Sequence, residues 1–259
     1  MLDDAKPLSS LGPADVDQIN IFYIHAPDPL TPLSELLAGI QAFYETGGFK
    51  KFGLSNFDAE GIQAVYDHCK AHDYVLPTVH ANLCCPLLAL ARSAYVFQVF
   101  EMNYNAFSRH SETTIFPLLR KLGIACYAYS PLAGSFLAKS RQAVEAGEGR
   151  FNAAFPIFGP LYTGLYCRPL LVQALAHWGE IAAEQDCSPA DLAHRWLAYH
   201  SALESEHGDG IVIGAASEEQ LRKTVTGLEA GPLKKTVVNR IDGIWESIRE
   251  EAPIDNFHQ

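Results

Sequence analysis

The fold of this chain is decided by residues 19–56, which read INIFYIHAPDPLTPLSELLAGIQAFYETGGFKKFGLSN. Residues 19–25 are rich in β-branched and aromatic side chains, a composition typical of a strand. A helix is predicted next, because Thr31 is a good N-cap, a proline follows it, and apolar residues then recur at helical spacing up to a glycine pair. Residues 50–56 form the second predicted strand. This order indicates two parallel strands joined by a crossover helix.

The same alternation continues along the chain and predicts a single α/β domain over residues 1–259. Polar residues follow several predicted strand ends, as they do on the active-site face of a (β/α)8 TIM barrel. A doubly wound sheet is the alternative fold, and the lack of a GxGxxG motif after a strand disfavours it. Later helices are predicted to begin at Asp58, Ser111, Ser188 and Ser217, and later strands to cover residues 124–130 and 210–214.

The charge balance excludes one large class of partners. The chain carries 19 Lys and Arg against 30 Asp and Glu, a formal net charge of −11, and has no Lys- or Arg-rich run. A nucleic-acid partner is therefore not expected. The longest apolar stretch, residues 84–91, is far shorter than the roughly 20 residues of a membrane span. The first six residues are acidic and lack a hydrophobic segment, so neither a membrane partner nor a secretory signal is expected.

The cysteines and histidines give no metal site. Six cysteines lie among apolar neighbours without CxxC spacing, which predicts reduced, mostly buried thiols in a cytoplasmic protein. His68 and His72 are four residues apart on a predicted helix, a spacing compatible with a metal, but no third ligand is near them in the sequence. We interpret this pair as part of a solvated helix face.

Six short segments carry a family resemblance. They are residues 22–28 (FYIHAPD), 53–57 (GLSNF), 104–106 (YNA), 127–134 (YAYSPLAG), 149–151 (GRF) and 212–221 (VIGAASEEQL). In this order they resemble the aldo-keto reductase superfamily, and within it the aflatoxin-aldehyde-reductase-like branch. The matching segments extend over nearly the whole chain, so their order is more specific than any one of them.

The resemblance implies a (β/α)8 barrel that binds NADPH without a Rossmann fold and reduces aldehyde and ketone carbonyls to alcohols. In this family a tyrosine, assisted by a lysine and an aspartate, donates a proton to the carbonyl oxygen. His25 corresponds to the histidine that orients the substrate carbonyl. Ser55 and Asn56 would hold the nicotinamide carboxamide, and Tyr129 would stack on the nicotinamide ring.

Two later segments complete the implied cofactor site. Residues 130–139 would wrap the pyrophosphate with backbone N–H groups, with Arg150 adding a cation, and the helix N-terminus in residues 216–224 would meet the adenosine 2′-phosphate. By resemblance these segments supply Ser130, Leu132, Gly134, Lys139, Arg150, Ser217 and Gln220. Related proteins often carry an asparagine where Thr224 stands, so the adenine contact of this chain is left without an obvious donor.

The proton donor has no counterpart that we can assign. Only 24 residues precede His25, whereas one βαβ unit needs about 30 residues. We therefore expect a barrel that lacks roughly its first three βα units and is truncated at its N-terminus. Tyr23 is a conceivable substitute for the missing tyrosine, although a strand tyrosine is more often part of a core.

A second departure is an atypical insertion near residues 80–100, which has neither strand nor helix periodicity. It leaves two candidates for the glutamine with which the family binds the carboxamide. Gln98 matches in residue type, whereas Glu101 has the expected spacing from Tyr104; we favour Gln98. The chain also lacks the aromatic-Arg pair that ends related proteins and contacts acidic substrates, and Arg168 is the candidate to replace it.

The favoured function is thus NADPH-dependent carbonyl reduction of a small molecule, with a role in secondary metabolism implied by fungal members of the family. Two alternatives stay open: a catalytically impaired barrel that binds nucleotide or a protein partner, and a truncated gene product. The sequence does not specify an oligomeric state.

Overall fold

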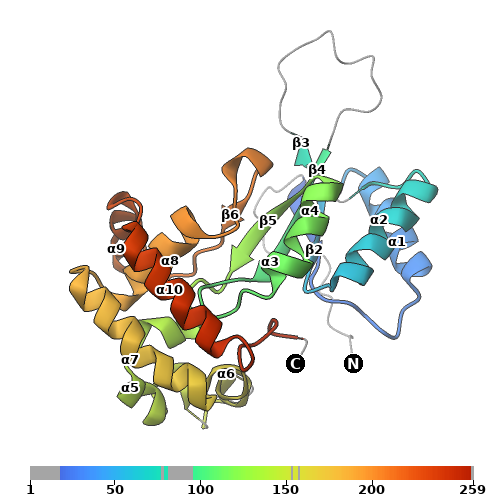
Figure 1. The fold of residues 1–259 in the computed structure, drawn as a ribbon. Coiled ribbons are helices and arrows are strands. Elements are labelled where there is room, and N and C mark those ends of the chain that lie inside the picture. Colours follow the sequence, from blue (N-terminus) through green and yellow to red (C-terminus); the bar gives the residue numbers. More distant parts are fainter. Residues whose placement is uncertain (1–17, 77–78, 81–95, 153, 157, 258–259) are drawn as a thin grey trace.

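The computed structural model contains a parallel sheet with helices packed along it (Figure 1). The structure describes residues 18–76, 79–80, 96–152, 154–156 and 158–257. The strands are β1 (Ile19–Ile24), β2 (Phe49–Ser55), β3 (Val79–His80), β4 (Val96–Asn103), β5 (Ile124–Tyr129) and β6 (Gly210–Ile211). Five of them pair in parallel in the order β1-β2-β4-β5-β6, and β3 pairs antiparallel with β4.

The helices fall between and after these strands. The α-helices are α1 (Leu33–Glu45), α2 (Ala59–Ala71), α3 (Ser111–Thr114), α4 (Phe116–Leu122), α5 (Arg141–Glu145), α6 (Phe158–Tyr166), α7 (Pro169–Glu184), α8 (Pro189–His200), α9 (Glu218–Glu229) and α10 (Lys235–Ile248). Three 3₁₀ segments are η3 (Ala133–Ala138), η4 (Gly149–Phe151) and η5 (Ser205–His207). In Figure 1, α1 and α2 lie at one end of the row of strands, and α8 and α9 lie at the other.

The predicted strand–helix–strand unit is confirmed. β1 pairs in parallel with β2, with Tyr23 opposite Gly53, and α1 crosses between them. The predicted strand at residues 210–214 is wrong in its extent, because regular pairing ends at Ile211 and only Val212 N adds a further hydrogen bond, to Ala128 O.

Local capping explains several of the helix starts, but the prediction that Thr31 caps α1 is wrong, because Pro32 is its N-cap and the Thr31 hydroxyl donates to Asp28 instead. Asp58 accepts a hydrogen bond from Gly61 N at 2.7 Å, Ser188 forms a capping box with Asp191, and Ser217 accepts from Gln220 N. The prediction that Ser111 caps a single long helix is wrong. The segment is split into α3 and α4, because Pro117 has no N–H to continue the hydrogen-bond ladder from the preceding turn.

One face of the sheet packs against helices and forms the core. Phe52 and Leu54 of β2 and Phe100 of β4 are buried there. The opposite face carries Tyr23, Gly53 and Ser55 on β1 and β2, because successive side chains of a strand point to opposite faces. The apolar core side chains of these strands and the polar side chains near their carboxyl ends therefore lie on opposite faces of the sheet.

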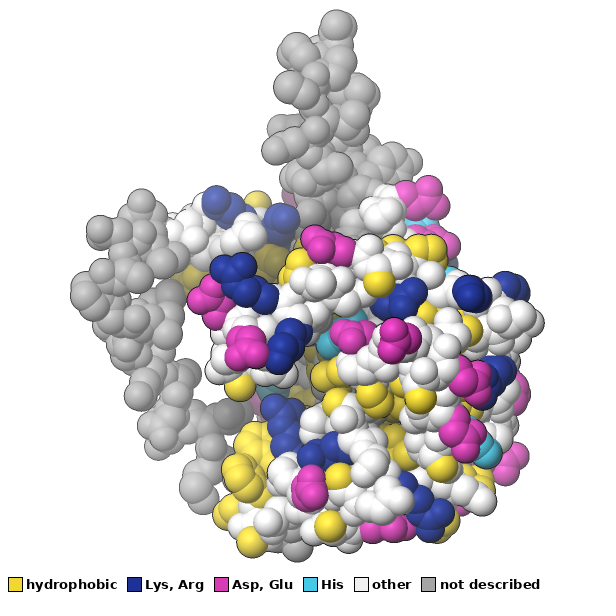
Figure 2. Space-filling view, turned by 90° about the vertical axis from the view of Figure 1, so that its left-hand side faces the viewer, with side chains coloured by type: hydrophobic (Ala, Val, Ile, Leu, Met, Phe, Trp, Pro, Cys, Tyr) yellow, Lys and Arg dark blue, Asp and Glu magenta, His cyan; other side chains and the backbone are white. Residues whose placement is uncertain are grey.

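The molecular surface is acidic but mixed. Figure 2 shows Asp and Glu side chains interspersed with Lys and Arg over the visible face rather than gathered by sign. Four described cysteines are free: Cys69 and Cys126 are buried, as predicted, whereas Cys167 and Cys187 are partly exposed. Among the described residues no helix is long and apolar enough to cross a membrane.

The parallel α/β arrangement fits a fold of the (β/α)8 type. No ladder joins β6 to β1 within the described residues, so closure of the sheet into a barrel is not seen. Most of the predicted insertion, residues 81–95, lies outside the described part of the chain.

Candidate active site

The carboxyl ends of neighbouring strands bring His25, Asn56 and Tyr129 together. Asn56 Nδ2 donates to the backbone oxygen of His25 at 2.8 Å and to Ser55 Oγ at 3.0 Å. Tyr129 Oη donates to Asn56 Oδ1 at 2.7 Å. The imidazole of His25 is exposed, whereas Ser55 and Asn56 are buried. One amide therefore connects β1, β2 and β5 at the edge where a (β/α)8-type fold builds its active site.

Glu101, rather than Gln98, lies at the same end of the sheet as His25, Asn56 and Tyr129. Glu101 pairs with Ser55 across β2 and β4, and its backbone oxygen accepts from Ser55 Oγ at 3.1 Å. Gln98 lies opposite Ile124, the first residue of β5, and so belongs to the other end of β4. Burial raises the pKa of the Glu101 carboxyl, while nearby His25 partly opposes this shift.

Replacing Glu101 by Gln is expected to increase the free energy of unfolding at neutral pH. A carboxyl whose pKa is higher in the folded state than in the unfolded state destabilises the protein as pH rises above its ordinary value of 4.5. Glu101→Gln removes that ionisation, so its stability should fall less between acidic and neutral pH. Urea unfolding over this range tests the prediction, with exposed Glu250→Gln as control. Parallel pH curves for Glu101→Gln and the wild type would contradict it.

The backbone around this site is held in an unusual conformation. Asn56, Ser130, Ala133 and Ser135 all have positive φ angles, of 60°, 55°, 50° and 82°, although none is glycine. Such conformations cost of order 1–3 kcal/mol each and cluster at functional sites. Asn105 Nδ2 holds this backbone by donating to Ser130 O at 3.2 Å. The strain is therefore concentrated in the segments predicted to bind the nicotinamide and the pyrophosphate.

The predicted pyrophosphate loop keeps two cations near its backbone. Lys139 Nζ lies 3.8 Å from Glu148, and Arg150 Nη1 donates to Tyr162 Oη at 3.4 Å with its guanidinium over the Tyr162 ring. Neither cation is in a tight ion pair, since the Lys139 contact is long and Arg150 has an aromatic partner. Both remain available to an anion.

The predicted 2′-phosphate segment is formed by the start of α9. Ser217 caps this helix, and Gln220 Oε1 accepts from Ala216 N at 2.8 Å. Gln220 also lines a cavity of about 580 Å³ together with Leu132, which comes from the loop after β5. The structure thus brings the two later cofactor segments to one cavity.

The C-terminal tail contributes residues that the sequence interpretation missed. Asn256 Nδ2 donates to Tyr129 Oη at 3.4 Å, and the Phe257 ring meets the His25 ring edge-on at 6.0 Å. Arg168 helps to hold this tail, because its Nη1 donates to Glu251 O at 2.8 Å. Its guanidinium is thus bonded to backbone rather than placed beside His25. No sequence signal marks these contacts, because they depend on the packing of segments more than 80 residues apart.

Tyr23 is not set up as a proton donor. It packs over Gly53 on the polar face of the sheet, and burial together with nearby Glu101 raises its pKa far above the ordinary value. A phenol that holds its proton so tightly is a weak general acid. Tyr23 lies two residues before His25 along the chain, and its contacts do not otherwise indicate a catalytic role.

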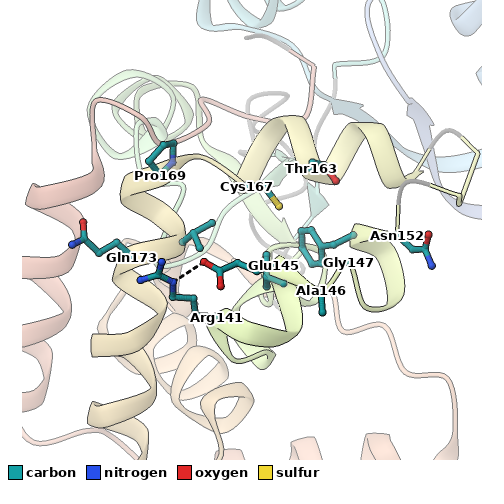
Figure 3. Close-up of a pocket in the computed structure, with 12 residues that line it drawn as sticks. Arg141, Glu145, Ala146, Gly147, Asn152, Thr163, Cys167, Pro169 and Gln173 are labelled. Atoms are coloured by element: carbon teal, nitrogen blue, oxygen red, sulfur yellow. Dashed lines mark hydrogen bonds and ion pairs between the residues drawn. The ribbon is translucent and has the colours of Figure 1, made fainter.

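Another cavity, of about 850 Å³, lies away from these residues, between α5, α6 and α7 (Figure 3). Arg141 on its wall is neutralised by Glu145 at 2.7 Å. None of the predicted site residues is among the described residues that line it. It is separate from the candidate site.

A sheet of parallel strands with a polar site at its carboxyl edge is typical of α/β enzymes, and sequence comparison makes the class specific. The model of the aldo/keto reductase family matches residues 8–246, so the chain belongs to this family. The predicted family resemblance, including the aflatoxin-aldehyde-reductase-like branch, is confirmed.

Three relatives illustrate the match. Oxidoreductase sirO of Leptosphaeria maculans is 33% identical over 92% of this chain and 66% of its own length. Aflatoxin B1 aldehyde reductase member 2 of Homo sapiens is 32% identical over 95% of this chain and 64% of its own length. Aldo-keto reductase pigE of Monascus ruber is 25% identical over 93% and 66%, respectively. The chain therefore spans about two thirds of the length of these curated relatives.

Proposed function

We propose that this chain binds NADPH at the carboxyl edge of its sheet and belongs to an oxidoreductase that reduces aldehyde and ketone carbonyls of small molecules to alcohols. The observation that carries the proposal is the convergence of His25, Asn56 and Tyr129. Family membership supports the reaction class. Free cysteines support a cytoplasmic location, and a role in secondary metabolism rests on the resemblance to fungal members of the family.

The residues at the site fit a nicotinamide. Asn256 Oδ1 is buried and has no hydrogen-bond partner in the described part of the chain, so it can accept from an amide N–H. The donors of Asn56 and Ser55 are already used within the site, but Asn56 Oδ1 and Ser55 Oγ each retain a lone pair that can accept from the N–H groups of a carboxamide. The Tyr129 ring supplies an aromatic face between them and the tail. When bound, the cofactor would supply a hydride to the carbonyl carbon.

His25 would contact the substrate carbonyl, whereas Lys139 and Arg150 would contact the phosphates of the cofactor. The exposed imidazole of His25 can donate a hydrogen bond to a carbonyl oxygen, and Phe257 limits where its ring can turn. Lys139 and Arg150 would neutralise the pyrophosphate, and the α9 N-terminus around Ser217 would favour a further phosphate. We assign proton transfer to no described residue.

Binding of nucleotide without turnover is the second candidate function, and it is favoured because none of the described residues is assigned as the proton donor. Purified chain should be mixed with NADPH and a panel of aromatic aldehydes and dicarbonyls. Carbonyl-dependent oxidation of NADPH supports the enzyme. Quenching of protein fluorescence by NADPH without its oxidation supports the binder, and no quenching overturns both proposals.

Replacing Tyr129 by Ala is expected to weaken NADPH binding about tenfold or more, the value for loss of one stacking platform. Tyr129→Phe should change the affinity by less than about threefold, because it keeps the ring and loses only two neutral hydrogen bonds, one donated to Asn56 and a longer one accepted from Asn256. Fluorescence titration measures both values, with exposed Tyr44→Phe as control. Equal losses in the Ala and Phe variants would show that the ring face is not the binding surface.

A further inference from the structure

The cavity lined by the predicted pyrophosphate segment and the predicted 2′-phosphate segment is also lined by His194, which has no role in the proposed function. It is lined by residues of α8 and α9 and by Leu132, and its wall includes His194, Gln220 and Thr224. Its volume of about 580 Å³ is in the range of small-molecule sites. Leu132 and Gln220 are predicted cofactor contacts, whereas His194 belongs to a helix that the sequence interpretation connected with no ligand.

His194 is unusual because one of its two ring nitrogens is buried without a partner within the described residues. The residue is 4% exposed, and its Nδ1 has no hydrogen-bond partner within the described residues. Buried polar side-chain atoms nearly always have a partner, so an unpaired one needs an explanation. The Thr224 hydroxyl already donates to Gln220 O at 3.1 Å, so it has only acceptor capacity left.

The charged groups around His194 are mostly paired with one another. Asp191 accepts from the hydroxyl and N–H of Ser188, and Lys223 is paired with Glu219 at 2.8 Å. Burial lowers the pKa of His194, with Asp191 and a hydrogen bond to the backbone of Ala190 partly opposing the shift, so its imidazole is neutral at physiological pH. A neutral imidazole offers one N–H donor and one nitrogen acceptor.

We propose that His194 recognises the adenine of the dinucleotide by a hydrogen bond to its polar edge. This inference rests on the proposed NADPH binding and adds the residue that reads the base. An uncharged, planar heterocycle with neighbouring donor and acceptor atoms matches a buried neutral imidazole, whereas a phosphate calls for a cation or a set of N–H donors. Gln220 and Leu132 line the same cavity as His194, so a base bound there would lie beside both predicted cofactor segments.

Two ligand comparisons test this role. The wild-type chain should bind NADPH about five- to tenfold more tightly than the reduced hypoxanthine analogue, in which the adenine amino group is replaced by an oxygen, since one neutral hydrogen bond is lost. His194→Leu should weaken NADPH binding by a similar factor and remove most of this discrimination. Reduced nicotinamide mononucleotide, which lacks the adenine, should bind both proteins equally. His194→Gln should restore part of the discrimination, because it retains a donor and an acceptor.

Exposed His177→Leu is the matched control and should behave as the wild type. If wild-type protein binds NADPH but not more tightly than the hypoxanthine analogue, the adenine assignment is overturned and the proposed function stands; this measurement needs no variant to fold. Unchanged discrimination in folded His194→Leu would also overturn it. If no nucleotide binds the wild-type chain, the proposed function itself fails.

Discussion

Replacing Asp209 by Ala is expected to lower the free energy of unfolding by about 3–5 kcal/mol, the cost of leaving a buried partner charge uncompensated. The Asp209 carboxylate is 1% exposed and accepts two hydrogen bonds from Arg120, at 3.1 and 2.5 Å. It also accepts from the backbone N–H groups of Cys126 and Glu204, at 2.7 and 2.8 Å. One side chain thereby joins α4, β5 and the segment before β6.

Chemical denaturation of Asp209→Ala and the wild type measures this loss, and Glu218→Ala is the control. Glu218 forms an ion pair with Arg222 on α9 that is fully at the surface, and such pairs contribute at most about 0.5 kcal/mol. A loss below about 1 kcal/mol in Asp209→Ala would mean that the cluster tolerates an unpaired arginine. Asp209→Asn should lie between the two, because it keeps the shape and part of the acceptor capacity.

The sequence predicts the alternating part of this fold well and its central strand, β4, poorly. The segment of β1, α1 and β2 has a clear change from strand composition to helical spacing and back. β4 lies between β2 and β5 in the sheet. Apolar residues occur on both of its faces, such as Val99 and Phe100, so it lacks the simple alternation of a half-buried strand. The insertion predicted near residues 80–100 therefore includes the first half of β4.

The residues of the candidate site likewise fall into those that the local sequence predicts and those that it does not. Asn56 and Tyr129 belong to short motifs at strand ends, so local sequence is enough to single them out. Neither Asn256 nor His194 belongs to such a motif, because each acquires its place through packing against a distant segment. The choice between Gln98 and Glu101 depends on strand register, since three residues along a strand move a side chain by about 10 Å.

Replacing Gly134 by Ala is expected to lower the free energy of unfolding by about 2–5 kcal/mol and to weaken NADPH binding at least tenfold. Gly134 has φ +66°, which costs an L-residue about 1–2 kcal/mol. A Cβ here would also overlap with the ring of Tyr162, adding the cost of overpacking, about 1–3 kcal/mol. Tyr162 is buried and stacks near Tyr166 and Phe158, so the ring has little room to move away.

Gly123→Ala separates the two contributions. Gly123 has nearly the same φ, +68°, but a Cβ at this position would meet no atom within 4 Å. Its substitution should therefore cost only the backbone term, about 1–2 kcal/mol, and leave NADPH binding unchanged, because it ends α4 away from the site. The excess loss in Gly134→Ala then measures the contact with Tyr162, which also receives the hydrogen bond from Arg150. Equal losses of stability in the two variants, with NADPH binding intact in both, would show that the loop after β5 adapts without disturbing the predicted pyrophosphate site.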